Sequence, residues 1–356
     1  MFTMIGQHAT GAGHWSAWSM LKLLLLTSFP TLSLTAPPSV SHPIASSESE
    51  SMKSLAALKT MAPKYRFTAV PGYFKMEGRG PRNEVPTMPG MGLIDQPYPT
   101  DEAFDPQRSK QPWERFVNLL NSWNESEKGK AAYKLIYVTR HGQGYHNAKE
   151  SDVGSAEWET RWVMLNGDDN STWFDSHLTL EGIRQAMTMN AFWQDAATKL
   201  KLPLPRRYYA SPLARCLETC KLSFEGIELP PGQEKPPFKP IIKELLRERL
   251  HFHTCDRRRN GTWIRENFPE FEFEEGFVDE DVYWKTEGRE TLQEHAARTM
   301  ALLEDVFEHD DEQIISFSTH SGTIAALIKA TGHEDFFVEP GNVVPFLIKG
   351  EIIQPN

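Results

Sequence analysis

The chain has 356 residues, of which 48 are acidic and 38 are basic, so its formal net charge at pH 7 is −10. With 39% hydrophobic residues, this composition excludes a polytopic membrane protein, a collagen and a fully disordered chain. The acidic balance argues against a protein that coats nucleic acid, because such a protein needs a basic face. Three cysteines are too few for a disulfide framework.

The first 60 residues have the composition of a leader and a linker. Within residues 1–36, Lys22 precedes a short apolar run and small residues follow it, over residues 20–36. This is the layout of a secretory signal peptide, and the run is too short to span a bilayer. The pattern favours secretion, with a disordered leader and a cytoplasmic location as the alternative. Residues 37–60 are rich in Ser, Pro and Ala and predict a disordered linker.

An alternation of strands and helices begins near residue 113, after a Pro- and Gly-rich segment at 61–112 that we expect to be an ordered arm over the domain. Strands are predicted at 134–139, 207–210, 240–243, 313–318 and 343–348. Helices are predicted at 180–200, from Ser211-Pro212 (as N-cap and first helical residue) to about 222, at 290–308 and at 322–330. Alternation of this kind indicates an α/β protein with a mostly parallel sheet. Pro345 suggests that the last strand lies at an edge or is irregular.

Polar side chains gather in the loops that follow four of these strands. Because ligands of parallel sheets bind beyond the carboxyl ends of the strands, we expect these side chains to lie together. They are Arg140, His141 and Asn147 after the first strand, Arg215 after the second, Glu248 after the third and His320 after the fourth.

Such a set suits phosphoryl transfer. A guanidinium group can bind two phosphate oxygens at once, through two parallel hydrogen bonds. A neutral imidazole can attack phosphorus, while a second imidazole stabilises the oxygens that carry the charge. A carboxyl group can protonate the leaving oxygen. Each of these residues alone more often has a structural role, so the inference depends on their joint placement. The phosphoryl transfer that they suit requires no metal ion.

Four short motifs carry a family resemblance: RHG at 140–142, SPLxR at 211–215, LRE at 246–248 and HSG at 320–322. In this order they resemble the histidine phosphatase superfamily, in its phosphoglycerate mutase-like branch. Over about residues 63–350, the stretches TAVPGYF, RHGQGYHN, ELLRE and HTCDRR are similar to those of fungal phosphoglycerate mutase family proteins. The acid phosphatase and phytase branch usually has Asp after its second His, where this chain has Ser321.

The resemblance implies a three-layer α/β/α fold with a mostly parallel central sheet and one catalytic domain over residues 61–350. It also implies roles for the site residues. His141 would be the phosphorylated nucleophile, and Arg140, Arg215 and His320 would form the phosphate pocket.

The remaining roles come with departures from the family pattern. Glu248 matches the proton donor, although residues 250–252 stand where the family often has Gly, and Glu244 is a rival acid. Asn147 matches a contact to phosphate or substrate. His146 replaces a frequent aromatic residue, so we expect the substrate contacts to differ.

Two insertions, at about 148–177 and 251–289, are expected to shape specificity. In the second, the arginines at 257–259 either contact substrate or face solvent, and the acidic run at 270–281 is interpreted as a solvated face or lid edge. The motif His251-x-His253-x-Cys255 resembles part of a zinc site, but no fourth ligand lies nearby in the sequence, so no metal is predicted.

We therefore expect a metal-independent phosphatase that hydrolyses small phosphomonoesters through a phosphohistidine, without a cofactor. The alternatives are a mutase, which returns the phosphate to its substrate, and a non-catalytic protein that binds a phosphorylated ligand. The expected partner is a small phosphorylated metabolite, with no nucleic acid and no membrane span, and the pattern leaves the oligomeric state open. The acidic total does not oppose this, because the local field decides which ligand binds.

Overall fold

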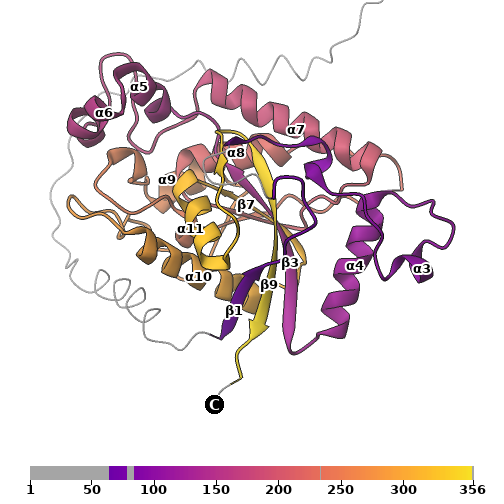
Figure 1. Ribbon diagram of the computed structural model, residues 1–356. Helices are drawn as coiled ribbons and strands as arrows, with labels where there is room; N and C mark the ends of the chain where they lie inside the picture. Colours follow the sequence, from indigo (N-terminus) through magenta and orange to yellow (C-terminus); the bar gives the residue numbers. More distant parts are fainter. Residues whose placement is uncertain (1–63, 78–83, 233, 355–356) are drawn as a thin grey trace, which may run out of the picture. The chain divides into compact units, whose positions relative to one another are not determined.

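The computed structural model describes residues 64–77, 84–232 and 234–354, drawn as ribbons in Figure 1. The predicted signal segment at 20–36 and the linker at 37–60 lie outside these residues, and secretion stays a prediction. The described residues belong to a unit that spans residues 45–356. None of the described helices is long and apolar enough to cross a membrane.

A seven-stranded sheet organises the domain, in the order β1-β9-β3-β7-β4-β5-β6. Its strands are β1 (Tyr65–Ala69), β3 (Ala131–Arg140), β4 (Arg207–Ala210), β5 (Pro240–Ile242), β6 (Glu272–Phe273), β7 (Ile314–Thr319) and β9 (Val343–Ile352). Every pair from β3 to β6 is parallel, and β9 is antiparallel to both of its neighbours, β1 and β3. Strand β3 is almost wholly buried, as expected for a strand covered on both faces. A second, two-stranded sheet pairs β2 (Glu84–Val85) with β8 (Phe337–Val338).

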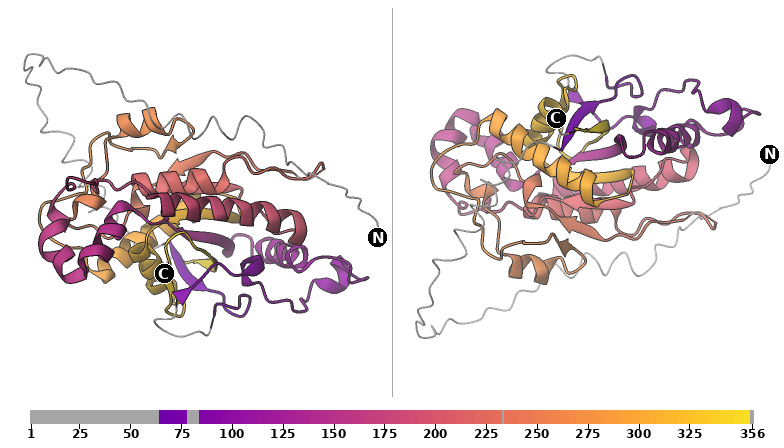
Figure 2. Two further views of the ribbon diagram at one scale, coloured as in Figure 1. Left: turned by 90° about the horizontal axis from the view of Figure 1, so that it is seen from above. Right: turned by 90° about the horizontal axis from the view of Figure 1, so that it is seen from below.

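Helices cover both faces of the large sheet. They are α3 (Asp101–Phe104), α4 (Pro112–Ser126), α5 (Tyr145–Val153), α6 (Ser155–Arg161), α7 (Leu180–Leu200), α8 (Ala214–Phe224), α9 (Gly261–Asn267), α10 (Leu292–His309) and α11 (Ser321–Thr331). Short 3₁₀ turns lie at η1 (Pro89–Gly92), η2 (Trp162–Met164), η3 (Glu244–Leu246) and η4 (Thr254–Asp256). Helices α7 and α8 lie on one face of the sheet, and α10 and α11 lie on the opposite face (Figure 2). Right-handed crossovers account for this, because the chain moves from β3 outward to β6 and then returns to β7 and β9. The predicted α/β/α fold is confirmed.

Two details of the element predictions differ from the structure. The helix after β4 begins at Ala214 with Leu213 as its N-cap, because the hydroxyl of Ser211 faces His320 instead of capping the helix. Pro345 does not mark an edge strand, since β9 lies between β1 and β3. However, β1 pairs only with residues 348–352, so Pro345 lies where β9 has a single partner strand and a missing N–H is tolerated.

The arm at 61–112 joins the sheet more closely than expected. It supplies β1, which forms an edge of the large sheet, and β2, which pairs with β8. Its apolar side chains Phe67, Phe74 and Met91 are buried in the same core as β3 and β7. The predicted position over the domain therefore understates the contribution of the arm to the fold.

We expect Trp193→Ala to lower the free energy of unfolding by about 3–5 kcal/mol, because it leaves a large cavity. Trp193 is fully buried on α7, and its ring lies 4.9 Å from that of Tyr137 and 5.2 Å from that of Phe224. Met187→Ala, on the exposed side of the same helix, should change this free energy by less than about 0.5 kcal/mol. Urea denaturation measures both, and similar losses for the two variants would contradict this packing.

Candidate active site

The two predicted site histidines follow the ends of paired parallel strands. Arg140 is the last residue of β3, and His141 follows it, while His320 follows the end of β7. The backbone N–H of His141 donates to the carbonyl of Thr319 at 2.9 Å. This pairing brings the rings of His141 and His320 to a centroid distance of 5.1 Å, and both side chains are buried.

His141 is held in one tautomer and kept neutral. Its Nδ1 lies 2.7 Å from the carbonyl oxygen of Gly142, which can only accept, so Nδ1 carries the proton and Nε2 carries the lone pair. Burial, and then the charges of Arg215 and Arg140, hold the pKa of His141 well below its usual range. The ring therefore presents an unprotonated nitrogen with a free lone pair at neutral pH, as a nucleophile requires.

His320 contacts two other site groups. Its Nδ1 lies 3.2 Å from Nη2 of Arg215, which can only donate, so Nε2 carries the proton and donates to Oγ of Ser211 at 2.8 Å. Burial and the nearby charge of Arg215 hold the pKa of His320 well below its usual range. The structure thus places His320 against Arg215 and Ser211, and its contact with phosphate stays a prediction.

Arg215 is 1% exposed and lies on the first turn of α8. Its Nη2 donates to Oδ1 of Asp256 at 2.6 Å, and its Nη1 donates to the carbonyl of Cys255 at 2.7 Å. The other carboxylate oxygen of Asp256 lies 3.1 Å from Nε2 of His251. Burial alone would raise the pKa of Asp256, but the hydrogen bond from His251 and the charge of Arg215 hold it well below its usual range. Asp256 is therefore the anionic partner that holds Arg215.

The sequence motifs do not single out Asp256, although it lies in the stretch HTCDRR. A carboxylate directly before three arginines suggests a local ion pair. Its partner is instead Arg215, 41 residues earlier in the chain.

Arg140 has partners of a different kind. Its Nη1 donates to the carbonyl of Val338 at 2.9 Å, and its guanidinium lies 5.0 Å from the ring centroid of Phe337. These contacts are with neutral groups, so they leave the charge of Arg140 available to an anion. The two predicted phosphate arginines thus differ, because Arg215 has a carboxylate partner and Arg140 is held by a carbonyl and a ring.

Glu248 lies at the N-terminus of α11, beside the predicted phosphate pocket. Its Oε2 accepts from the backbone N–H of Gly322 at 3.1 Å and contacts Oγ of Ser321 at 3.5 Å. A Cβ on residue 322 would lie 1.9 Å from Oε1, so a larger residue here would push the flexible end of the Glu248 side chain away from this position. The rival acid Glu244 instead accepts from Nε of Arg258 at 2.7 Å, which leaves Glu248 as the better candidate.

Asn147 and His146 belong to the loop after β3. The side-chain oxygen of Asn147 accepts from the backbone N–H of Gly144 at 3.0 Å, so it stabilises the first turn of α5. The contact of Asn147 with substrate stays a prediction.

His146 is buried, and its ring centroid lies 5.5 Å from that of His141. Burial, and then the charge of Arg215, hold the pKa of His146 well below its usual range, so its ring adds a neutral wall to the pocket.

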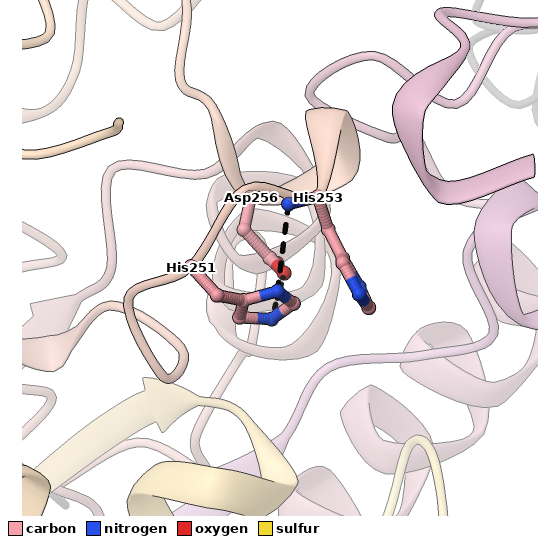
Figure 3. Close-up of side chains that lie close together, drawn as sticks. All are labelled: His251, His253 and Asp256. Atoms are coloured by element: carbon pink, nitrogen blue, oxygen red, sulfur yellow. Dashed lines mark hydrogen bonds and ion pairs between the residues drawn. The ribbon is translucent and has the colours of Figure 1, made fainter. Parts of the chain in front are cut away.

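A group that could hold a metal ion does lie near the site, but its contacts favour hydrogen bonding. The ligand atoms of His251, His253 and Asp256 lie within 4.8 Å of one another (Figure 3). Nδ1 of His251 accepts a long contact of 3.4 Å from the backbone N–H of His253, which leaves the proton on Nε2 facing Asp256. Asp256 already pairs with the cation of Arg215. Cys255, which belongs to the motif His251-x-His253-x-Cys255, is not a member of this group.

The second insertion neutralises buried arginines. Asp281 accepts two hydrogen bonds from Arg247, at 2.6 and 2.7 Å, and its side chain is 4% exposed. The carbonyls of residues 278–280 accept from the buried guanidinium of Arg258. The interpretation of 270–281 as a solvated face is therefore wrong for Asp281, and the solvent-facing alternative is wrong for Arg258, which is 2% exposed. Contact of these arginines with substrate stays a prediction.

We expect Asp256→Asn to lower the free energy of unfolding by about 3–5 kcal/mol, because it leaves the buried charge of Arg215 without its carboxylate. The low pKa of Asp256 means that the wild-type advantage is fully present above about pH 4 and is lost as the pH falls further. Urea denaturation across this pH range measures the difference. Asp195→Asn, which removes an exposed ion pair with Lys199, should cost less than about 1 kcal/mol, and equal losses would contradict the role of Asp256.

Comparison with known proteins agrees with this geometry. A sequence model of the histidine phosphatase superfamily (branch 1) matches residues 136–336, which include His141, Arg215, Glu248 and His320. A probable phosphoglycerate mutase of Arthroderma benhamiae is 40% identical over 293 residues, which are 82% of this chain and 86% of that protein. A probable phosphoglycerate mutase of Saccharomyces cerevisiae is 30% identical over 79% of this chain and 95% of its own length.

Among solved structures, the chain is similar to a putative alpha-ribazole-5′-P phosphatase from Escherichia coli, with a TM-score of 0.36 and 15% identity over 62% of this chain and 96% of that one. It is also similar to a phosphoglycerate mutase from Thermus thermophilus, with a TM-score of 0.33 and 22% identity over 59% and 91% of the two chains. On its sequence matches, the chain belongs to the histidine phosphatase superfamily, in its phosphoglycerate mutase-like branch.

Proposed function

We propose that this protein is a phosphatase that hydrolyses small phosphomonoesters through a phosphohistidine on His141. Membership of the superfamily supports phosphoryl transfer, by a phosphatase or a mutase. The observation that carries the proposal is the state of His141, a buried neutral imidazole with Nε2 unprotonated, next to Arg140 and Arg215. No metal ion or cofactor takes part in the proposed reaction.

The proposed reaction has two steps. The substrate phosphate binds to Arg140, Arg215 and His320, and Nε2 of His141 attacks phosphorus in line. The bond from phosphorus to the ester oxygen breaks as Glu248 gives that oxygen its proton. The Glu248 carboxylate then takes a proton from water as the water attacks phospho-His141, which releases inorganic phosphate and restores both residues.

A mutase is the alternative that a specific observation favours. A mutase must keep water from the phosphohistidine until the phosphate returns to the substrate, and the side chains around His141 are buried, with Arg140 8% exposed. The relatives named above carry the name of a mutase. A non-catalytic phospho-ligand-binding protein is less well supported, because the whole set of two arginines, two histidines and a glutamate is present.

We expect His141→Ala to abolish turnover of p-nitrophenyl phosphate, and retained turnover would overturn the proposal. The exposed His309→Ala should retain wild-type activity. Wild-type protein quenched during turnover should carry acid-labile phosphate that His141→Ala lacks.

Incubation with 3-phosphoglycerate separates the phosphatase reaction from the mutase reaction, since a phosphatase releases inorganic phosphate and a mutase forms an isomer. EDTA should leave the activity unchanged.

We expect Glu248→Gln to slow alkyl phosphate hydrolysis by about 100- to 10,000-fold, because an alkoxide needs a proton to leave. The loss on p-nitrophenyl phosphate should be much smaller, because nitrophenolate leaves without one. Steady-state kinetics on both esters measure this dependence on the leaving group. Glu244→Gln is the matched comparison, because disruption of the ion pair with Arg258 should slow both esters equally. If the dependence appears in Glu244→Gln instead, Glu244 is the acid.

A further inference from the structure

A pocket of about 460 Å³ lies between the first turns of α11 and the segment that carries β8. We refer to it as the β8 pocket, and its wall includes Ser321, Ala325, Phe337 and Val338. Neither the sequence motifs nor the reaction proposed above gives this pocket a role.

The wall of the β8 pocket touches two groups of the candidate active site. Phe337 and Val338 hold the guanidinium of Arg140, by ring contact and by hydrogen bond. On the opposite wall, Oγ of Ser321 lies 3.5 Å from the carboxylate of Glu248. A phosphate bound to Arg140 with its ester oxygen toward Glu248 would therefore direct the rest of the molecule past Ser321 into this pocket.

The inner wall of the β8 pocket is apolar. Ile324 is 2% exposed, Phe336 is buried beside it, and Ala325 leaves room above the helix. Phe337 is 40% exposed, so its ring is accessible from the pocket. Surfaces of this kind bind apolar groups, and an exposed ring stacks on planar ones.

The rim of the β8 pocket is acidic. Glu84 and Asp335 line it, and no lysine or arginine is among the described residues that do so. Glu339 lies beside Glu84, and a hydrogen bond with this carboxyl group raises the pKa of Glu339. A ligand with a carboxylate at this rim would meet like charges, whereas a neutral or cationic ligand would not.

We propose that the β8 pocket binds the alcohol part of the substrate, and that this part is apolar, aromatic for preference, with a neutral or positively charged outer end. This proposal rests on the phosphatase function proposed above. It excludes as good substrates those phosphomonoesters whose alcohol part carries a carboxylate.

A second pocket, of about 310 Å³, has more basic than acidic side chains in its lining and provides the competing prediction. It is lined by Phe174, Asn260, Trp263, the arginines at 257–259, and the acidic Glu280 and Asp281. Arg259 stacks on Trp263 and pairs with Asp175 at 3.2 Å. The hydrogen-bond partners of Arg140 and Glu248 described above do not line this pocket. If it held the alcohol part, anionic substrates would be favoured instead.

The test compares phenyl phosphate with its 4-carboxy and 4-aminomethyl derivatives, which share an aryl leaving group and differ in charge. We expect kcat/KM to be about 10- to 100-fold lower for the carboxylated ester than for the other two. Combined Glu84→Gln and Asp335→Asn substitutions should remove most of this difference, by raising kcat/KM for the carboxylated ester. Equal or faster turnover of the carboxylated ester by wild-type protein overturns the proposal.

A steric variant tests the location of the alcohol part independently of charge. Ala325→Trp fills the β8 pocket and should lower kcat/KM for phenyl phosphate by about tenfold or more, with little effect on ethyl phosphate. Ala330→Trp, on the same helix, is the matched control. Equal effects of the two variants on phenyl phosphate overturn the proposal. If wild-type protein hydrolyses none of these esters and forms no phosphohistidine, the proposed function fails instead.

Discussion

A buried guanidinium must be neutralised, and much of this site follows from that requirement at Arg215. An unpaired charge in the interior costs several kcal/mol, so a carboxylate must be buried with it. Asp256 supplies that carboxylate, and His251 donates a hydrogen bond to the second oxygen of Asp256. The same rule holds at Arg247 and Arg258, whose partners come from η3 and the second insertion. Carboxylates of the second insertion therefore hold buried arginines in and next to the site.

In the reaction we propose, the two arginines divide the task of holding the phosphate. Arg215 is neutralised by Asp256, so its contribution is mainly directional, through hydrogen-bond donors in a fixed plane. Arg140, with a carbonyl and an aromatic ring as contacts, contributes its charge. A net charge of −10 is compatible with such a site, because the local field, and not the total charge, decides which ligand binds.

Local patterns predicted the elements of the fold well, and tertiary contacts account for what they missed. The buried apolar runs of β3 and β7 and the spacing in α7 were enough to place those elements, and the strand ends then brought together His141 and His320. Ser211 could not be assigned from its neighbours, because its hydroxyl bonds a histidine 109 residues away. The motif at 320–322 does not reveal that the backbone of Gly322 contacts the carboxylate of Glu248, which is 74 residues earlier in the chain.

The place of β9 in the sheet has a consequence for how the protein is made. Strand β9 spans residues 343–352 but lies between β1 and β3, which are synthesised much earlier. During translation β1 and β3 cannot pair with β9, and one edge of β3 stays unpaired, until residues 343–352 have left the ribosome. Contacts of such long sequence separation form slowly, and open strand edges promote aggregation. The nascent chain is therefore exposed to chaperones and to misassembly until β9 pairs with β1 and with β3, the strand that ends at Arg140.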